Sequence, residues 1–376
     1  MTNRSDNPGQ SILTKLENAF EFAQHQVKGI IERTPDYFPM YTVNGKWRHT
    51  GELWTHWCDG FLPGMMWLIY EQTSDDWWRE KAEHYSRLLE DRKDDRNVHD
   101  LGFIFMSTYY RWYKLTGERW LNDVLIQAGR TLSLRFREKG QYLCSFIGPQ
   151  SLFIDIMMNV GIIFYAAEQT GDEQLKDLAI RHCLTTQKFL VRPDGSTAHE
   201  GIFDTDTGEF LHQDTHQGLR PDSCWSRGLS WALYGFGTAY HYSNRPEFLQ
   251  TAEACADYYL ARVPEGKVPY WDFDVPEGPD RLWESSAAAI AASGLWNLAS
   301  LSQSQEKRQR YRDAAIEIVD TLASDRFLAR AHPQWEGILM HGIYHFHKKL
   351  GVDESVMWGE HFFLEALLKV INGPAR

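Results

Sequence analysis

The segment from Asp214 to Trp231 concentrates side chains that can hydrogen-bond to a ligand and stack on it. It holds two carboxylates, a histidine, a glutamine, two arginines and two tryptophans. A sugar ring carries hydroxyls at its edge and C–H groups on its faces, and an arginine such as Arg227 can fork onto a carboxylate. The segment therefore indicates a site for an acidic sugar. In the alternative interpretation it is a loop with a helix cap, its tryptophans are core and Arg227 is a surface charge.

Two aspartates elsewhere could transfer a proton, and each stands at the start of a predicted helix. Asp155 lies among Phe153, Ile154 and Ile156, which is an unusual setting for a carboxylate. We expect burial to raise the pKa of Asp155 and keep it partly protonated near neutrality, as a general acid requires. In the alternative, Asp155 and Asp100 are N-caps of the helices that follow. Both interpretations stay open for Asp100, whereas the apolar neighbours favour a functional role for Asp155.

Other candidate residues carry weaker signals. His341, His345 and His347 stand close together, but no H-E-x-x-H motif or Cys/His cluster accompanies them, so we expect no metal site. The sequence also lacks a phosphate-binding loop, a G-x-G-x-x-G fingerprint and a G-x-S-x-G elbow, and we expect no cofactor. His199 lies in a connecting segment, where it either binds a sugar hydroxyl or is exposed. Trp57 precedes the first apolar helix and forms either a stacking wall or part of the core.

Composition excludes several classes of partner. The chain has 376 residues, 43% of them hydrophobic, and a formal net charge of −12. A nucleic acid or an anionic membrane needs a basic face, so we expect neither as a partner. The five cysteines form no C-x-x-C pair, which indicates reduced thiols, and Met1–Ser11 lacks the apolar core of a secretion signal. The sequence predicts a cytoplasmic protein with a small ligand, and it leaves the oligomeric state open.

The elements that must position these side chains form an irregular repeat. In each unit an apolar helix is followed by a polar turn and then by an amphipathic helix, and turns such as Thr-Gly-Asp end one helix and cap the next. Helices that are apolar nearly all round are typical of buried positions. The predicted inner helices are Gly60–Tyr70, Leu101–Leu115, Asn159–Gln169, Gly228–Tyr242, Ser285–Leu301 and Phe362–Ile371. The predicted outer helices are Ile12–Glu32, Trp77–Leu89, Trp120–Phe136, Gln174–Leu190, Pro246–Arg262 and Lys307–Leu322.

Six such helical pairs close best as a double-layered (α/α)6 barrel, an all-α fold, and we expect one catalytic domain over residues 1–376. The alternative is an open helical solenoid. Strands are predicted to be few, with Lys267–Asp274 the best candidate and short pairings near Tyr41 to Trp47. The segments that lead from each outer helix to the next inner helix should gather at one end of the barrel. They are 49–60, 92–101, 140–158, 191–227, 264–285 and 324–361, and they hold the candidate residues.

From about residue 50 to 370 the chain resembles the unsaturated glucuronyl hydrolases, glycoside hydrolase family 88. No single motif carries the resemblance, but their order and spacing do. They are Trp57-Cys-Asp-Gly-Phe61, His99-Asp-Leu-Gly-Phe103, Ile154-Asp155, Thr215-His-Gln-Gly218, Trp225-Ser-Arg-Gly228 with Trp231, Val268-Pro-Tyr-Trp-Asp-Phe273, Glu284-Ser-Ser-Ala287 and Trp358-Gly-Glu-His-Phe362. Members of this family share the (α/α)6 barrel, which agrees with the repeat.

The resemblance implies roles for individual positions. Asp155 matches the general acid/base of the family and Asp100 matches its second essential aspartate. The candidate substrate contacts are Trp57, Phe146, His199, His216, Gln217, Arg227 and Trp231, with Arg227 near the uronate carboxylate. The chain departs from the family at Phe146, where relatives often have a tryptophan, and at Glu360-His361, where they tend to have Asp-Tyr. Both departures are expected near the substrate end, where they leave open the preferred leaving sugar and its sulfation.

The reaction that the resemblance implies follows from the substrate, a small acidic oligosaccharide such as an unsaturated uronyl disaccharide released by a polysaccharide lyase. Its C4=C5 double bond and ring oxygen form an enol ether. Asp155 is expected to protonate C4, water adds at C5, and the resulting hemiketal opens to release the aglycone. Three alternatives remain: a hydrolase of unsaturated galacturonyl-rhamnose (a rhamnogalacturonyl hydrolase) with the same fold, an ordinary glycosidase of saturated substrates, and a sugar-binding protein without activity.

Overall fold

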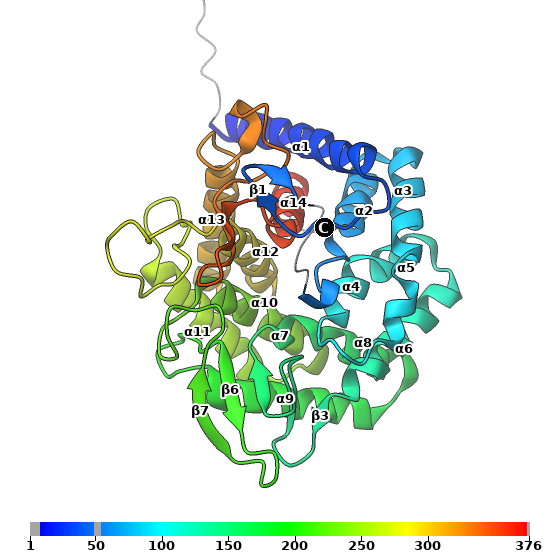
Figure 1. The fold of residues 1–376 in the computed structure, drawn as a ribbon, viewed down its shortest axis with the longest axis vertical. Helices are drawn as coiled ribbons and strands as arrows, with labels where there is room; N and C mark the ends of the chain where they lie inside the picture. Colours follow the sequence, from blue (N-terminus) through cyan, green and yellow to red (C-terminus); the bar gives the residue numbers. More distant parts are fainter. Residues whose placement is uncertain (1–7, 49–53, 374–376) are drawn as a thin grey trace, which may run out of the picture.

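The computed structural model describes residues 8–48 and 54–373, and this part of the chain is mostly helical (Figure 1). Its inner helices contact one another in a closed ring, from α2 through α4, α7 with α8, α10, α12 and α14 back to α2. Their bounds are α2 Phe61–Thr73, α4 Leu101–Ser107, α5 Tyr109–Thr116, α7 Ile156–Asn159, α8 Gly161–Thr170, α10 Ser226–Ser243, α12 Ser285–Leu301 and α14 Met357–Asn372.

A second layer of helices covers the ring. Helix α3 packs on α2, α6 on α8 and α5, α9 on α8, α11 on α10, α13 on α12, and α1 on α14. Their bounds are α1 Pro8–Arg33, α3 Asp76–Arg87, α6 Arg119–Ser133, α9 Glu173–Leu190, α11 Pro246–Arg262 and α13 Gln305–Leu322. The predicted ranges of the outer helices are confirmed to within a few residues at each end, and that of α11 is identical.

The sequences of the two layers explain their positions. Helix α12 is buried along almost its whole length and consists largely of alanine and serine, which lets its neighbours approach from both sides. Helix α13 buries only the stripe Tyr311, Ala314, Ala315, Ile318, Val319 and Leu322, so it is amphipathic. The Thr-Gly-Asp turn acts as predicted: Gly171 ends α8 at φ +67°, and Asp172 accepts the N–H groups of Gln174 and Leu175 at the start of α9.

The predicted inner helix Leu101–Leu115 is broken within its range, whereas the predicted helix Asn159–Gln169 is confirmed as α8, with the separate short helix α7 before it. Thr108 separates α4 from α5, and Val160 separates α7 from α8. The break at Val160 lies beside a close crossing of α4 and α7, where a side chain at Gly102 would meet the Cα atom of Asn159 at 2.5 Å. Asn159 also accepts the N–H of Phe103 at 2.8 Å through its Oδ1 atom.

Short antiparallel strands lie in the connecting segments. The pairing predicted near Tyr41 to Trp47 is confirmed as β1 (Thr42–Val43) with β2 (Lys46–Trp47). The strand predicted at Lys267–Asp274 is wrong, because this segment makes only isolated bridges, to Trp225 and Trp283. Its aspartates bond to a neighbouring loop instead: the Leu219 N–H donates to Asp272 and the Cys224 N–H donates to Asp274.

The sequence did not predict the strands nearest the candidate residues. One sheet has the order β5-β6-β7, and two further hairpins pair β3 with β4 and β8 with β9. Their bounds are β3 Phe136–Arg137, β4 Tyr142–Leu143, β5 Ser151–Phe153, β6 Glu200–Phe203, β7 Phe210–Asp214, β8 Gly342–His345 and β9 Leu350–Glu354.

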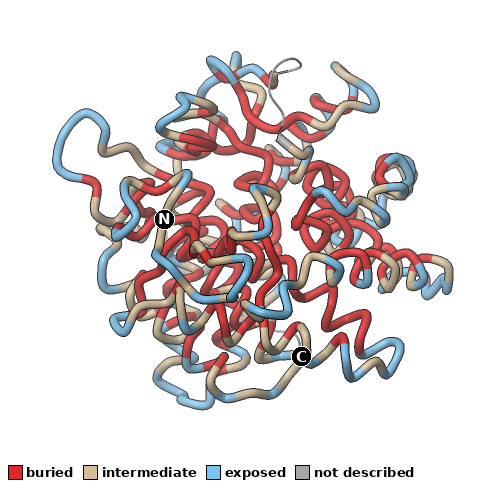
Figure 2. The backbone as a smooth tube through the Cα atoms, turned by 60° about the horizontal axis from the view of Figure 1, so that its bottom comes forward, coloured by how far each residue is buried: buried red, intermediate tan, exposed pale blue. Residues whose placement is uncertain are grey.

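Burial follows the same plan. Figure 2 shows buried backbone through the middle of the molecule and exposed backbone at the turns around it. All five cysteines are buried and free, as expected. Within the ranges 8–48 and 54–373, no helix has both the length and the apolar character needed to cross a membrane.

Candidate active site

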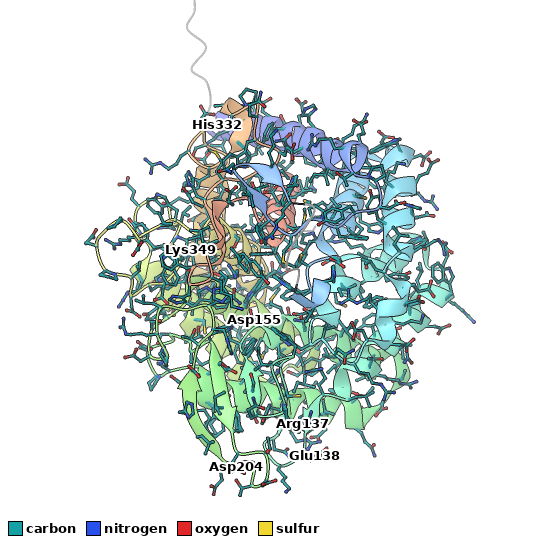
Figure 3. All side chains as sticks on the ribbon, in the orientation of Figure 1. Arg137, Glu138, Asp155, Asp204, His332 and Lys349 are labelled. Atoms are coloured by element: carbon teal, nitrogen blue, oxygen red, sulfur yellow. The ribbon has the colours of Figure 1, made fainter. Side chains whose placement is uncertain are left out.

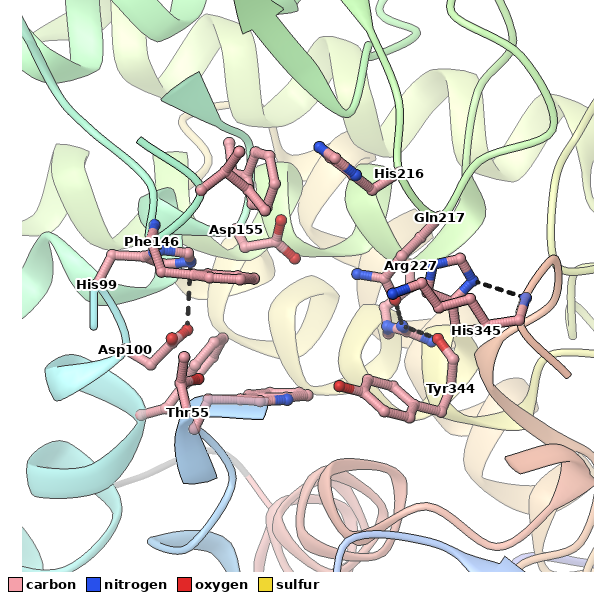
Figure 4. Close-up of a pocket in the computed structure, with 15 residues that line it drawn as sticks. Thr55, His99, Asp100, Phe146, Asp155, His216, Gln217, Arg227, Tyr344 and His345 are labelled. Carbon is pink, nitrogen blue, oxygen red and sulfur yellow. Dashed lines mark hydrogen bonds and ion pairs between the residues drawn. The ribbon is translucent and has the colours of Figure 1, made fainter. Parts of the chain in front are cut away.

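A cavity of about 340 Å³ opens where the connecting segments gather (Figure 4). Five of the six predicted segments supply its wall, although residues 49–53 of the first lie outside the described residues. In Figure 3 the labelled Asp155 lies near the middle of the molecule, whereas Arg137, Glu138 and Asp204 lie at its edge. The wall consists of Thr55, Trp57, His99, Asp100, Phe103, Phe146, Ile147, Phe153, Asp155, His216, Gln217, Arg227, Tyr344, His345 and Lys348.

An aromatic layer closes the bottom of this cavity. The ring of Phe103 packs against Trp57 at 5.6 Å, Phe61 at 5.3 Å and Trp231 at 5.0 Å, measured between centroids. Phe362 packs on the far side of Phe61 and Trp231. Because Phe103 also lines a second cavity of about 320 Å³, the layer separates two chambers of the barrel. Aromatic rings of this kind suit the apolar faces of a sugar.

Asp155 stands at the turn between β5 and α7, and the pairing of β5 with β6 brings it to His199. Its Oδ2 atom lies 3.4 Å from His199 Nε2. Its side chain makes no capping hydrogen bond, so the N-cap alternative is excluded. Burial alone would raise the pKa of Asp155, but His199 and, further away, His99 and the Arg227 guanidinium lower it below its ordinary value. The predicted rise in the pKa of Asp155 is therefore wrong.

Asp100 has the opposite electrostatic environment. It is buried at the start of α4, its Oδ1 atom lies 3.4 Å from His99 Nε2, and it makes no capping hydrogen bond either. Burial and the nearby charge of Asp155 raise the pKa of Asp100 to about 8, and no cation comes close enough to reverse this. Burial lowers the pKa of His99 to about 3, so its ring is neutral. At neutral pH the two carboxyl groups therefore share one proton, which resides on Asp100.

Arg227 forms the opposite wall. It extends from the first turn of α10, is almost fully buried, and lies between the rings of Trp225 at 4.5 Å and Trp358 at 4.9 Å. Its Nη1 atom donates to Glu284 Oε2 at 2.8 Å and to a main-chain carbonyl, so it is not a surface charge. Its Nη2 atom donates to the Tyr344 carbonyl at 2.9 Å and to the side-chain oxygen of Gln217. Of these four acceptors, only Gln217 Oε1 belongs to a side chain of the cavity wall.

A second basic group stands between Arg227 and Asp155 at the cavity rim (Figure 4). The half-exposed His216 places its Nε2 atom 3.0 Å from Oε2 of Glu200, which is buried on β6. This hydrogen bond, and to a smaller degree the charge of Glu200, raises the pKa of His216 above its ordinary value. The Arg227 side of the cavity is therefore cationic, whereas the Asp100 side is not.

The structure brings most of the predicted site residues together. The cavity wall includes seven of them: Trp57, Asp100, Phe146, Asp155, His216, Gln217 and Arg227. His199 and Trp231 do not line it; His199 lies behind Asp155 and Trp231 lies in the aromatic layer. The departure at Glu360-His361 is not near the substrate end, because His361 lines the second cavity and Glu360 accepts main-chain N–H groups of Ile338 and Leu339.

Sequence reasoning missed several groups. Glu284 fixes Arg227, and the motif Glu284-Ser-Ser-Ala287 could have pointed to it. Thr55, Ile147 and Tyr344 line the cavity from short segments that carry no distinctive pattern, with Tyr344 on β8.

The histidines that first suggested a metal have other partners. The Nδ1 atom of His341 lies 2.6 Å from Asp353 Oδ1, and His347 Nε2 lies 2.8 Å from the carbonyl of Gly218. The described part of the chain contains no group of three or more Asp, Glu, His and Cys side chains that could hold a metal ion.

Comparison with known proteins gives a consistent result. The profile of Glycosyl Hydrolase Family 88 matches residues 30–325. The chain is 36% identical to an unsaturated glucuronyl hydrolase from Bacillus sp. (strain GL1) over 331 residues, which cover 85% of this chain and 87% of that protein. A crystal structure of the Bacillus sp. GL1 enzyme, responsible for the degradation of glycosaminoglycan, superposes with a TM-score of 0.87 at 33% identity and covers 94% of this chain and 96% of that one.

A further solved structure contains a sugar. It is a mutant unsaturated glucuronyl hydrolase from Streptococcus agalactiae, complexed with dGlcA-GalNAc6S. It superposes with a TM-score of 0.82 at 28% identity and covers 96% of this chain and 92% of that one.

Proposed function

The chain belongs to Glycosyl Hydrolase Family 88 and is a glycoside hydrolase, and from this premise we propose that it removes an unsaturated glucuronyl residue from the non-reducing end of an oligosaccharide released by a polysaccharide lyase. The observation that carries the proposal is one cavity wall that holds two buried carboxyl groups, Asp100 and Asp155, together with the buried guanidinium of Arg227. The names of the relatives and the sugar in a related structure support the substrate class. The closed double ring of helices supports an (α/α)6 barrel and a single catalytic domain.

Arg227 and Gln217 are the proposed binding groups for the uronate carboxylate. Gln217 Oε1 occupies the position next to Arg227 Nη2 that a carboxylate oxygen of the substrate would take. When the carboxylate enters, the amide turns away and can donate its own N–H groups to the ligand. The remaining donors of Arg227 keep their partners, so we expect one strong contact at this arginine rather than a two-point fork.

Substrate binding prepares Asp155 for proton transfer. The charge of Arg227 is one of the causes that lower the pKa of Asp155. A bound carboxylate compensates that charge, so the pKa of Asp155 rises and the shared proton can move to it from Asp100.

The reaction then uses the same carboxyl group twice. Asp155 donates its proton to C4, the π electrons of the C4=C5 bond form the new C–H bond, and the positive charge at C5 is shared with the ring oxygen. A water molecule adds to C5 and returns a proton to Asp155, which gives a hemiketal. The hemiketal opens and the aglycone sugar leaves. The anomeric carbon is never attacked, so the carboxylate-spacing rule for retaining and inverting glycosidases does not apply.

The test is a panel of lyase-generated disaccharides incubated with the purified protein, with the ultraviolet absorbance of the conjugated acid followed over time. We expect absorbance to fall for unsaturated glucuronyl substrates, and the masses of the two products together should equal the mass of the substrate plus one water molecule. Unsaturated galacturonyl-rhamnose and a saturated nitrophenyl glucuronide are the matched alternatives. Turnover of either alternative without turnover of the unsaturated glucuronyl substrates would overturn the proposal, and so would binding without turnover of any sugar.

A further inference from the structure

His199 makes an unusual set of contacts through one ring nitrogen. Its Nδ1 atom lies 3.1 Å from the main-chain N of His216 and 3.3 Å from that of Gln217. The hydroxyl oxygen of Thr215 is also 3.3 Å away, and it already accepts the Gly218 N–H at 2.8 Å, so its own proton is free to point at the ring. Every neighbour of Nδ1 is therefore a donor or able to act as one.

This set of donors fixes the tautomer of His199. A main-chain N–H can only donate, so the nitrogen that receives two of them must carry its lone pair and not a proton. In a neutral imidazole the single proton then resides on Nε2. A cationic imidazole would place an N–H at Nδ1 against two other N–H groups. The loop from Thr215 to Gly218 thus selects which nitrogen of His199 is the donor.

The other ring nitrogen faces the carboxylate of Asp155. His199 Nε2 and Asp155 Oδ2 are 3.4 Å apart, both atoms are fully buried, and neither has another hydrogen-bond partner in the described chain. The Asp155 side chain is 13% exposed although Oδ2 is not, so the exposed oxygen is Oδ1. The two oxygens are therefore distinguished: one faces the histidine and the other faces the cavity.

We propose that His199 is a positioning residue for Asp155. His216 and Gln217, which are proposed to contact the substrate, hold the ring of His199, and the ring sets the orientation of the Asp155 carboxylate. The main-chain N–H groups of these two residues hold the ring, and the ring directs its Nε2–H at Oδ2, which leaves Oδ1 for the reacting carbon. The proposal rests on the proposed catalytic role of Asp155. A movement of Gln217 on binding the uronate carboxylate is transmitted to Asp155 through one imidazole.

The same arrangement rules out a role for His199 as a proton relay. A relay needs Nδ1 to gain or lose a proton when Nε2 does, and here Nδ1 is occupied by two obligatory donors. The groups that face the Asp155–His199 pair from neighbouring elements are Asp100 and His99 at α4, Arg227 on α10, His345 on β8 and His216 on the loop after β7. Of these, only Asp100 shares the proton in the scheme above.

His99 offers an internal comparison, because it repeats the pattern at the other carboxyl group. Its Nδ1 atom accepts the Phe146 N–H at 3.0 Å, and its Nε2 atom lies 3.4 Å from Asp100 Oδ1. The two histidines differ in the number of main-chain donors. Phe146 donates one N–H to His99, whereas the loop from Thr215 to Gly218 donates two to His199.

Two substitutions separate the two functions of the ring. In His199→Asn the side-chain oxygen can replace Nδ1 and keep the loop N–H groups, but the donor to Asp155 is lost. In His199→Gln the terminal NH2 can replace Nε2–H and keep the contact to Asp155, but the acceptor for the loop is lost. For His199→Asn we expect kcat to fall about a hundredfold with KM nearly unchanged. The acidic limb of its kcat/KM profile should move to higher pH, because the Asp155 carboxylate loses a donor.

For His199→Gln we expect the opposite pattern, with the acidic limb in its wild-type position. KM should rise about tenfold, because the loop from Thr215 to Gly218 loses the acceptor that holds it. His182→Asn is the control, because His182 Nδ1 also accepts a main-chain N–H, that of Leu143 at 3.2 Å, but His182 does not line the cavity; this variant should leave KM and the acidic limb unchanged. The proposal is overturned if His199→Asn keeps the wild-type acidic limb and kcat, or if the two His199 variants show the same pattern.

A measurement on the unaltered protein needs no turnover. In protein labelled with ¹⁵N-histidine, the His199 ring signals are assigned by their loss in His199→Asn. Near neutral pH we expect an unprotonated Nδ1 and a protonated Nε2; a protonated Nδ1 overturns the proposal. If no unsaturated sugar is turned over by the wild-type protein, the proposed function fails while this measurement still decides the tautomer.

Discussion

The two chambers on either side of the aromatic layer shift the pKa of a buried carboxyl group in opposite directions. In the second chamber Glu365 is buried on α14, and it contacts Arg111 at 2.8 Å and Lys369 at 3.2 Å. Burial alone would raise the pKa of Glu365, but these two cations lower it far below its usual range. In the first chamber Asp100 is equally hidden from solvent and faces a neutral histidine, and its pKa rises to about 8.

The difference shows that burial alone does not make a carboxyl group reactive. Glu365 also accepts hydrogen bonds from Tyr234 and Ser293, so every part of its charge is compensated. Such a group stabilises the fold and exchanges no proton near neutral pH. Asp100 and Asp155 have single long contacts to histidines, and that incomplete compensation leaves a proton available between them. The first chamber is organised for chemistry and the second for stability.

The largest effect is expected from a substitution of the reactive carboxyl group in the first chamber. Asp155→Asn keeps the size and polarity of the side chain but can neither donate the proton nor take one from water. We expect kcat to fall by at least about 10²- to 10⁴-fold, the usual contribution of a positioned acid or base. The measurement is the rate of absorbance loss with an unsaturated disaccharide, and calorimetric binding of the same sugar should persist. A variant that keeps more than about a tenth of the rate contradicts the role.

Glu365→Gln removes the ion-paired carboxylate of the second chamber. It leaves Lys369 without its carboxylate and Arg111 with only the partly exposed Glu71, and we expect the free energy of unfolding to fall by about 3 kcal/mol. Denaturant titration checks this, with kcat expected to stay within about twofold at a permissive temperature. Glu71→Gln is the matched control, because Glu71 contacts the same Arg111 at 3.3 Å but is a third exposed, and its loss should cost less than about 1 kcal/mol.

The pH profile sharpens the comparison within the first chamber. The pKa of Asp100 is about 8, above its unfolded value, so the shared proton is held below pH 8 and lost as pH rises through it. We therefore expect kcat/KM to decline above about pH 8, by up to about tenfold per pH unit. The pKa of Glu360 is also raised to about 8, by burial, but Glu360 does not line the cavity. Glu360→Gln should leave the basic limb in place. If the limb shifts in this variant, Glu360 and not Asp100 is the group that titrates there.

The smallest effect concerns the wall of the first chamber. Phe146 stacks on His99 with centroids 5.5 Å apart, at a position where the sequence resemblance led us to expect tryptophan. Phe146→Trp enlarges the aromatic face and reduces the free volume. We expect KM to change about three- to tenfold, in a direction that depends on the aglycone, while kcat and its pH dependence stay constant. Michaelis analysis with two disaccharides of different aglycone checks this, and equal effects on both would exclude a role in aglycone selection.

Most of the helical layers could be predicted from local sequence. Apolar runs, Gly171 and Asp172 report burial, a helix end and a helix start without reference to the rest of the chain. The crossing of α4 with α7 could not be predicted in this way, because the residues that meet there, Phe103 and Asn159, are distant in the sequence. Local patterns therefore specify the layers but not the crossings between them.

The strands beside the site depend on contacts of the same long range. The pairing of β5 with β6 sets Phe153 opposite Glu200, and short strands of this kind carry little local signal. The Ile154 N–H then donates to the His199 carbonyl at 2.9 Å, which extends the pairing up to Asp155 itself. The sequence could not indicate this contact, because only the folded barrel brings its two partners together.

The candidate site was predictable in membership but not in electrostatics. Asp155 could be chosen from its apolar neighbours, but the direction of its pKa depends on His199 and Arg227, which lie in other segments. His361 was assigned to the wrong chamber for a similar reason. It follows Trp358, which packs beside Trp57 in the first chamber, by about one helical turn, and one turn along α14 is enough to cross the aromatic layer.

The contacts of α14 also bear on how the chain is made. Helix α14 closes the ring against α2 and carries α1 on its outer side, so the first and last described helices depend on each other. A ribosome delivers α1 and α2 long before α14, and during that interval the faces that later pack on α14 have no final partner. Synthesis of this protein therefore includes a long period in which the early helices must wait, and nascent-chain chaperones are the natural occupants of those faces.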